Sequence, residues 1–180
     1  LFNCAQETLV DGMARERQQY SGDGSHQLHA VIQTLGDITL PYRFVNTFSQ
    51  GLSIDGYFMD SWPAWDRLAR TVERQMHLTG WGPILDHSIG FCFDAFHYYM
   101  YTGDLQGLKE VYPRLLSFFS YLYKLTDKSE HLVPVENLGM CSVYIDHEAY
   151  KQTKHKQLAL NLYIVAMCQN ALSTLCQAFG

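Results

Sequence analysis

Three carboxylates and two arginines fall close together near the start of the chain. Asp11, Glu16 and Asp23 supply the acids, and Arg15 and Arg17 lie between them. Close carboxylates push one another's pKa values apart, so that one can stay protonated and act as a general acid. An arginine beside them can hold a second carboxylate ionised or orient a substrate hydroxyl. The pattern is typical of acid–base chemistry, although a solvated loop with idle ion pairs has the same composition.

A second group of residues is aromatic. All three tryptophans of the chain, Trp62, Trp65 and Trp81, lie in or beside expected loops, and Tyr57 and Phe58 precede them. Such rings pair an apolar face with a polar edge, which suits the apolar C–H faces and hydroxyls of a sugar ring. Carboxylates together with loop tryptophans therefore indicate a carbohydrate site. The alternative is that these rings fill the core between helix ends.

The remaining polar motifs are less specific. His26 and His29 are three residues apart on an expected helix, but a metal site needs a further ligand, so we predict neither a metal nor a cofactor. Asp86 and His87 form either a polarised pair or a helix N-cap followed by a first-turn histidine. Lys151, Lys154 and Lys156 form a local basic cluster that is expected to be solvated.

The elements that must position these residues are helical. Apolar residues recur with helical spacing along nearly the whole chain, and no strand pattern is present. We therefore expect an all-α fold of helical hairpins. The expected helices cover residues 1–10, 28–35, 43–54, 68–76, 89–100, 104–111, 113–122 and about 155–179. Breaks or loops are expected at residues 22–24, 36, 60–65, 79–83, 102–103 and 129–156.

Length and composition limit the class of protein. The chain has 180 residues, 47% of them hydrophobic, which suits one folded domain over residues 1–180. A formal net charge of −5 disfavours a nucleic-acid partner. The longest unbroken apolar run covers only residues 162–168, so no membrane partner is expected. The five cysteines form no C-x-x-C pair and are expected to be buried free thiols.

The last 24 residues, 157–180, contain no charged side chain. A solvent-facing helix normally carries charge on its outer face, so this helix is expected to be covered on nearly all sides. We interpret the chain as a fragment of a larger protein, with the covering surface elsewhere. An inner helix of a complete small bundle and a subunit interface are the alternatives. Uncovered apolar helix faces would favour a homodimer.

Four stretches together resemble one family of enzymes. The run from Asp11 to Asp23 resembles the signature D-C-P-x-R-E-R-L-G-W-T-G-D of bacterial α-L-rhamnosidases of glycoside hydrolase family 78. Residues 79–86 are similar to the G-W-G-D-A loop of that family. Residues 98–104, followed by Tyr112-Pro113, are similar to its Y-x-x-T-G-D…Y-P helix pair, and residues 143–146 to its G-D-W turn. The resemblance covers almost the whole chain.

The resemblance implies an (α/α)6 toroid, of which this chain would supply about half, and inverting hydrolysis of terminal α-L-rhamnose. By motif position, Glu16 matches the general acid of the family. The general base would be a glutamate on a later hairpin, so this chain alone is expected not to hydrolyse glycosides. The residues that match the sugar pocket are Asp11, Arg15, Asp23, Tyr20, Trp81 and Asp86.

Departures from the family pattern leave the exact sugar open. Tyr20 stands where the family has Trp, Gly12-Met13 replaces Cys-Pro, and three extra residues precede Asp86. The glycan and the compartment also stay open, although the family suggests a periplasmic or extracellular bacterial protein.

Two other classes of protein remain. One is another six-hairpin enzyme, a glucuronyl hydrolase or sugar phosphorylase, whose pocket would need Arg or Lys; residues 75–108 contain neither. The other is a non-catalytic helical module that binds a glycan or a protein. In that module, Glu16 and Asp23 would point to solvent, away from the tryptophan loops.

Overall fold

A computed structural model describes residues 4–5, 8–12, 17–63, 84–136, 143–145 and 156–180 of the chain. Every regular element in these ranges is a helix, which confirms the all-α prediction. Extended pairing in the same ranges is limited to three isolated bridges. The helices are α1 (Ser21–Leu35), α2 (Thr39–Ser49), α4 (Leu85–Thr102), the short 3-10 helix η1 (Gln106–Leu108), α5 (Tyr112–Leu125), α6 (Gln157–Ala166), the π-helical η3 (Met167–Leu172) and α7 (Ser173–Phe179).

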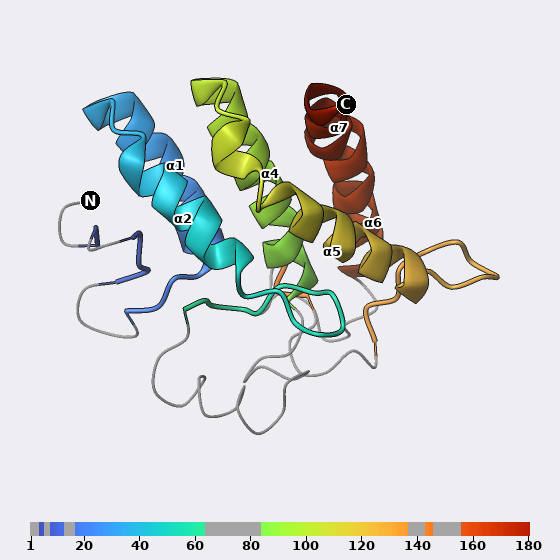
Figure 1. The fold of residues 1–180 in the computed structure, drawn as a ribbon. Helices are drawn as coiled ribbons and strands as arrows, with labels where there is room; N and C mark the ends of the chain where they lie inside the picture. The colour runs from blue at the N-terminus through green and yellow to red at the C-terminus, as the bar shows by residue number, and fades with distance from the viewer. Residues whose placement is uncertain (1–3, 6–7, 13–16, 64–83, 137–142, 146–155) are drawn as a thin grey trace.

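Helices α1, α4 and α6–α7 lie side by side and end at the same edge of the molecule (Figure 1). The Ser21 hydroxyl at the start of α1 donates to the carbonyl of His87 at the start of α4. At the other ends, the Gln33 amide donates to the Tyr101 hydroxyl. These two helices are therefore parallel, while α2 and α5 run back between them to form two hairpins. Whether these hairpins belong to a closed toroid stays a prediction.

Glycine and proline set the predicted helix ends. Gly36 and Gly103 adopt the left-handed conformation, with φ of 64° and 67°, and their backbone N–H groups donate to Ile32 and Tyr99. A left-handed residue after the last turn is a common helix stop, and glycine adopts it without strain. Pro113 lies in the first turn of α5, where a missing N–H costs nothing.

Two predictions about the first 24 residues are wrong. The described part of residues 1–10 is not helical, because Val10 N–H bonds to the Cys4 carbonyl and the backbone turns back on itself. The glycines at 22–24 do not break the chain, because they lie inside α1. A Cβ at Gly24 would stand 2.3 Å from the Phe44 ring. This glycine therefore allows α1 and α2 to approach closely.

Other boundaries differ less. The helix expected at residues 43–54 begins at Thr39 and ends at Ser49, and Ile54 lies in a turn with 79% of its surface exposed. Of the helix expected at residues 104–111, the structure forms only the 3-10 helix η1 with Leu105 as its N-cap, and the preceding Asp104 carboxylate accepts from Gly107 N–H. The helix expected at residues 68–76 and the loop at 79–83 lie outside the described residues.

An aromatic core joins α2, α4 and α5. Phe91 of α4 has its ring centroid 4.7 Å from that of Phe48 and 4.9 Å from that of Phe58. Phe58 in turn lies 5.7 Å from Phe118 of α5. All four rings are buried. Their burial supplies much of the hydrophobic free energy that holds the hairpins together.

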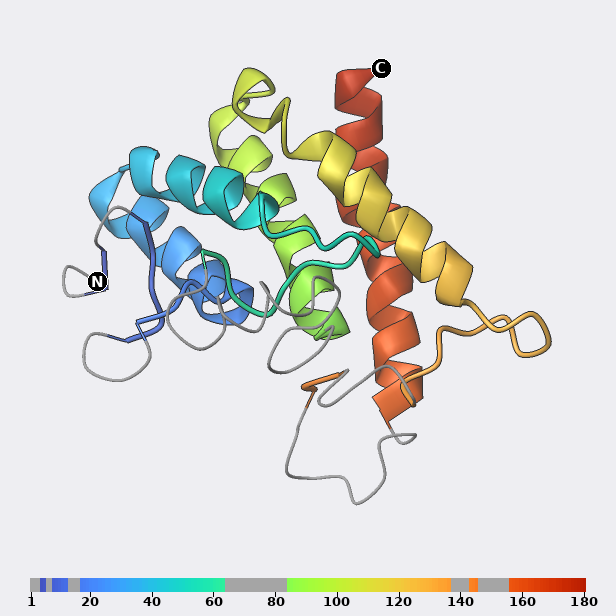
Figure 2. The ribbon, with the colours of Figure 1, turned by 60° about the horizontal axis from the view of Figure 1, so that its bottom comes forward.

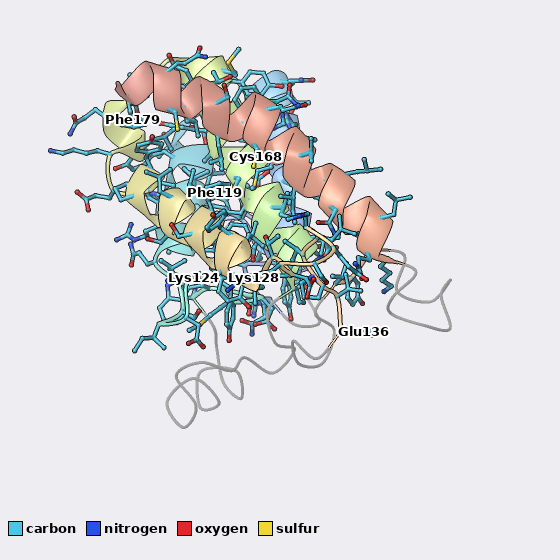
Figure 3. All side chains as sticks on the ribbon, turned by 90° about the vertical axis from the view of Figure 1, so that its right-hand side faces the viewer. Phe119, Lys124, Lys128, Glu136, Cys168 and Phe179 are labelled. Atoms are coloured by element: carbon cyan, nitrogen blue, oxygen red, sulfur yellow. The ribbon has the colours of Figure 1, made fainter. Side chains whose placement is uncertain are left out.

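The final helix is covered on one side only. Leu160 and Leu175 are buried, whereas Leu158, Leu162 and Val165 lie more than half or about half exposed on the opposite side. Figure 3 views this side, with Cys168 midway along the helix and Phe179 at its end. The described residues therefore cover this helix on one side only, which opposes the alternative of an inner helix in a complete small bundle. The interpretation that the covering surface lies elsewhere, in a larger protein or a second subunit, stays a prediction.

By length and composition alone, the 23-residue helical run Gln157–Phe179 is the single candidate membrane span among the described residues. One such helix is weak evidence for a membrane protein, since core helices of soluble proteins pass the same test. The described cysteines are free, as expected, but they are not uniformly buried: Cys92 is buried and Cys176 is exposed.

Candidate functional site

The acidic segment closes into a loop at its base. Asp11 N–H donates to the Gln18 carbonyl over 2.8 Å, and Gln18 N–H donates to Asp11 Oδ1 over 2.7 Å. Gln18 itself is buried. These bonds join Asp11 to Gln18, so the described residues on either side of positions 13–16 lie next to each other. Asp11 therefore holds the backbone of Gln18 with both its own N–H group and one carboxylate oxygen, and its second oxygen makes neither of these bonds.

From this loop the chain enters α1, whose start lies against the start of α4. Both helix starts and residues 143–145 lie at the same edge of the molecule, opposite the ends of α4 and α7 (Figure 2). Together with α6, they line a hollow of about 240 Å³, which we call the α1–α4–α6 hollow. Its lining residues are Ser21, Gly22, Ser25, His26, Asp86, His87, Gly90, Ile145 and Tyr163.

Two charged residues hold one wall of the α1–α4–α6 hollow. Asp86 Oδ1 accepts from the backbone N–H of Tyr144 over 2.8 Å. The buried Lys156 donates its ammonium to the Val143 carbonyl over 3.1 Å. Together they fix residues 143–145, so that Ile145 lines the hollow. Lys156 was expected to be solvated, and that prediction is wrong.

His87 faces two carboxylates but is held neutral by its burial. Desolvation is the main influence and lowers the pKa of His87, whereas the nearby Asp86 and Asp23 carboxylates act to raise it. Its ring lies 5.6 Å from that of Tyr144. A neutral imidazole has one donor and one acceptor nitrogen. It can therefore hydrogen bond to a ligand hydroxyl in either direction.

Asp94 lies deeper than any other carboxylate in the described residues. Burial raises the pKa of Asp94 to about 8, and the nearby Ser25 hydroxyl opposes that shift in part. Neither carboxyl oxygen reaches hydrogen-bond geometry with a described group. Tyr163 lies on the other side, and burial and the Asp94 charge raise its pKa to about 12. Asp94 and Tyr163 are therefore neutral near pH 7, and each offers a hydrogen-bond donor and an acceptor.

The structure brings some predicted site residues together and leaves others apart. Asp86 lines the hollow, and Asp23 is exposed in the first turn of α1, near enough to influence His87. Tyr20 is half-buried directly before α1, where its backbone pairs with Ser61. Asp11 lies at the base of the preceding loop. The remaining three, Arg15, Glu16 and Trp81, lie outside the described residues.

Asp86 is also not the N-cap that one interpretation of the sequence required. Helix α4 begins at Leu85 with Ile84 as its N-cap, so Asp86 belongs to the first turn. A first-turn carboxylate still interacts favourably with the helix dipole. Its side chain bonds to Tyr144 of the neighbouring segment, which no local pattern in the sequence indicates.

The aromatic group divides differently from the prediction. Tyr57 and Phe58 are buried in the core, and Trp62 packs half-buried against it. The core interpretation is therefore correct for these three residues, and Trp65 lies outside the described ranges. His26 and His29 do not form a metal site with any third ligand among the described residues. His29 instead contacts the His97 ring at 4.6 Å.

Three residues around the hollow were missed by sequence reasoning. Ser25, Tyr163 and Asp94 carry no motif, although Asp94 is the one charged residue between Ser88 and Thr102, in a stretch that otherwise has none. Comparison with known protein families, curated proteins and solved structures finds no match to this chain.

Proposed function

We propose that this chain belongs to a glycoside hydrolase that removes terminal α-L-rhamnose by inverting acid–base hydrolysis. Glu16 would protonate the leaving oxygen, and a base outside this chain would activate water. The α1–α4–α6 hollow would receive the terminal sugar. Its volume of about 240 Å³ lies below the roughly 300–1,000 Å³ typical of small-molecule sites, which suits one ring rather than an oligosaccharide.

One observation carries the proposal: segments far apart in the sequence that each resemble the same family meet around one hollow. The acidic loop leads directly into α1, Asp86 lines the hollow, and Tyr144 bonds to Asp86. A solvated surface loop with idle ion pairs, which is the alternative, does not predict that these segments meet. It supports a shared site, and the sugar itself is taken from the resemblance.

The lining also bears on the other six-hairpin enzymes. A carboxylate or phosphate substrate would require a cation, and the described lining of the hollow contains neither Arg nor Lys. The Ser21, Ser25 and Tyr163 hydroxyls, with the His87 ring whose lowered pKa favours the neutral form, instead offer paired donors and acceptors. Sugar hydroxyls, which both donate and accept, fit such a lining better than an anion does.

A non-catalytic glycan-binding module remains as a second candidate, because Asp23 is exposed. In a working pocket this carboxylate would face the sugar, whereas a module leaves it in solvent. The two candidates differ in whether a bond is broken. They agree that the hollow binds a sugar.

The test measures hydrolysis of an aryl α-L-rhamnoside by the longest natural polypeptide that carries this sequence. Glu16→Gln should lower kcat about 10²- to 10⁴-fold with rhamnose binding retained. Glu110→Gln, which changes an exposed carboxylate beside η1, is the matched control and should not alter kcat. Equal activity of Glu16→Gln and wild type would refute the assigned acid. Binding without turnover in both proteins would favour the binding module.

A further inference from the structure

Asp94 is a buried carboxyl group that the proposed acid–base step does not use. It is fully buried, and neither of its oxygens is in full hydrogen-bond geometry with a described group. The Ser25 hydroxyl is near enough to lower its pKa as a hydrogen-bond donor, so the carboxyl group is at most weakly bonded. Buried polar groups in folded proteins are nearly always bonded, so an exception needs an explanation. A polar ligand that is absent from the structure is one such explanation.

The position of Asp94 points to the α1–α4–α6 hollow. Gly90 lines the hollow, and Asp94 follows it by four residues, hence one turn further along the same face of α4. Ser25 of α1 and Tyr163 of α6 line the hollow from the other two sides, and both interact electrostatically with Asp94. Asp94 itself is not part of the lining and lies one turn behind Gly90, where the Tyr163 hydroxyl stands 3.4 Å from the position that a Cβ would take.

The surroundings also fix what chemistry Asp94 offers. Because its pKa is raised to about 8, the group is a neutral carboxylic acid at pH 7. A neutral acid has one O–H donor and a carbonyl acceptor. A sugar hydroxyl likewise donates one hydrogen bond and accepts others. The two groups can therefore satisfy each other without a charge being buried.

We propose that Asp94 is a specificity-determining residue of the hollow, and that one hydroxyl of a bound monosaccharide enters between Ser25 and Tyr163 to bond with its carboxyl group. This inference rests on the proposed function only in taking L-rhamnose as the first probe. It assigns to α4 a sugar contact that none of the four resembling stretches contains.

The experiment is isothermal titration of the longest natural polypeptide that carries this chain with L-rhamnose and with its 2-, 3- and 4-deoxy analogues. Asp94→Leu should weaken L-rhamnose binding about 10- to 100-fold. One deoxy analogue should bind wild type weakly but bind Asp94→Leu as well as L-rhamnose does. Such a double-mutant cycle isolates the contact between the carboxyl and that hydroxyl.

Tyr101→Phe is the matched control. It removes hydroxyl contacts with His29 and Gln33 at the far end of the same pair of helices, and it should leave the affinity unchanged. Thermal unfolding of each variant verifies folding, and Asp94→Leu should fold because it removes an unpartnered polar group.

The pH dependence separates a ligand contact from a structural role. Wild-type affinity should fall above pH 8, as the carboxyl loses its proton, whereas Asp94→Asn should show no such fall. Burial lowers the pKa of His29, His87 and His97 and raises that of Cys92, Cys168 and Tyr163, so these groups do not ionise in this window. The further titratable groups facing the site are Asp23, His26 and Asp86.

The outcomes distinguish this inference from the proposed function. Equal L-rhamnose affinity of wild type and Asp94→Leu overturns the inference, even if the protein hydrolyses rhamnosides. An ordered water bonded to Asp94 in place of the sugar would give this equal affinity. If wild type binds D-galactose or D-glucose instead, and Asp94→Leu abolishes that binding, the inference stands and the rhamnose assignment fails. Failure of wild type to bind any of these sugars overturns the inference.

Discussion

The two sides of α4 contrast in how well their side chains are satisfied. The side facing α2 and α5 presents Phe91, whose ring contacts other buried rings at centroid distances of 4.7 and 4.9 Å. The side facing α1 and α6 presents His87 and Asp94, both of which hold buried polar atoms without described partners. Burial of the aromatic rings on the first side stabilises the folded state. Burial of incompletely hydrogen-bonded polar groups on the second side destabilises it. If the proposed function is correct, the contrast separates the part of the helix that holds the fold from the part that would bind the sugar.

The largest expected effect comes from the aromatic side. Phe91→Ala should lower the free energy of unfolding by about 3–5 kcal/mol, because it removes a fully buried ring and leaves a cavity. Urea denaturation followed by circular dichroism measures the change. Phe119→Ala is the matched control, since that ring on α5 is 40% exposed and should cost clearly less. Equal losses in both variants would mean that the core does not centre on α4.

On the polar side, Asp94 should make stability fall as pH rises. Its folded pKa of about 8 lies above the ordinary value of 3.8. The folded state therefore keeps a proton that the unfolded chain has lost, and stability decreases by up to about 1.4 kcal/mol per pH unit between about pH 4 and 8. The measurement is the unfolding free energy of wild type minus that of Asp94→Leu across this range.

Taking the difference is necessary because nearby histidines act in the opposite direction. His29, His87 and His97 have lowered pKa values, so they stabilise the fold above about pH 6.5 and lose that contribution as pH falls. Both proteins contain these histidines, so the difference isolates Asp94. A difference that does not vary with pH would show that the carboxyl is ionised in the folded state.

The two sides of α4 were not equally predictable from the sequence. The aromatic side follows from helical periodicity, and the helix ends follow from Gly36 and Gly103, because both signals are local. Gly24 misled the prediction, because its role is to admit the Phe44 ring from another helix, and a lone glycine is locally indistinguishable from a break. Asp94 depends on what α1 and α6 place around it, which no local pattern contains.

The acidic loop shows the same division. Its residue types indicated acid–base chemistry, but the bonds that close it join Asp11 to Gln18, and Gln18 carries no chemical signal in the sequence. Asp86 was identified through resemblance, whereas its contact with Tyr144 spans 58 residues. Long-range contacts of this kind are set by packing, so sequence reasoning reached the residues and missed their partners.

A smaller effect is expected at a carboxylate that does have its partners. Asp104 accepts from the Tyr98 hydroxyl over 2.7 Å and from Gly107 N–H over 2.9 Å, and the tyrosine bond is the main reason that its pKa is lowered. Asp104→Ala should cost about 0.5–1.5 kcal/mol of unfolding free energy, as loss of a hydrogen-bonded side chain does. Because the folded pKa is depressed, this contribution is present above about pH 4 and is lost as pH falls through the folded value.

Thermal unfolding of Asp104→Ala and Asp104→Asn measures this effect, and the asparagine variant should retain part of the stability because its carbonyl can still accept from Gly107. The change in unfolding free energy should have opposite signs at the two acids. Near pH 7, removing the hydrogen-bonded Asp104 should destabilise the fold, whereas removing the buried Asp94 should stabilise it. A gain in stability for Asp104→Ala would contradict these two hydrogen bonds and remove the difference in sign between Asp94 and Asp104.

The smallest effect is expected on the outer side of the last helix. Leu162 is 61% exposed, so Leu162→Gln removes little buried surface and should change the unfolding free energy by no more than about 0.5 kcal/mol. Leu160→Gln, two residues earlier and fully buried, is the matched control and should be strongly destabilising, because it places an amide in the core.

Chemical denaturation at two protein concentrations tests both variants. A loss at Leu162 that grows with protein concentration would mean that a second copy of the chain covers this face, because stability then depends on association. A loss independent of concentration would instead mean that Leu162 is buried within the same chain, against its exposure here.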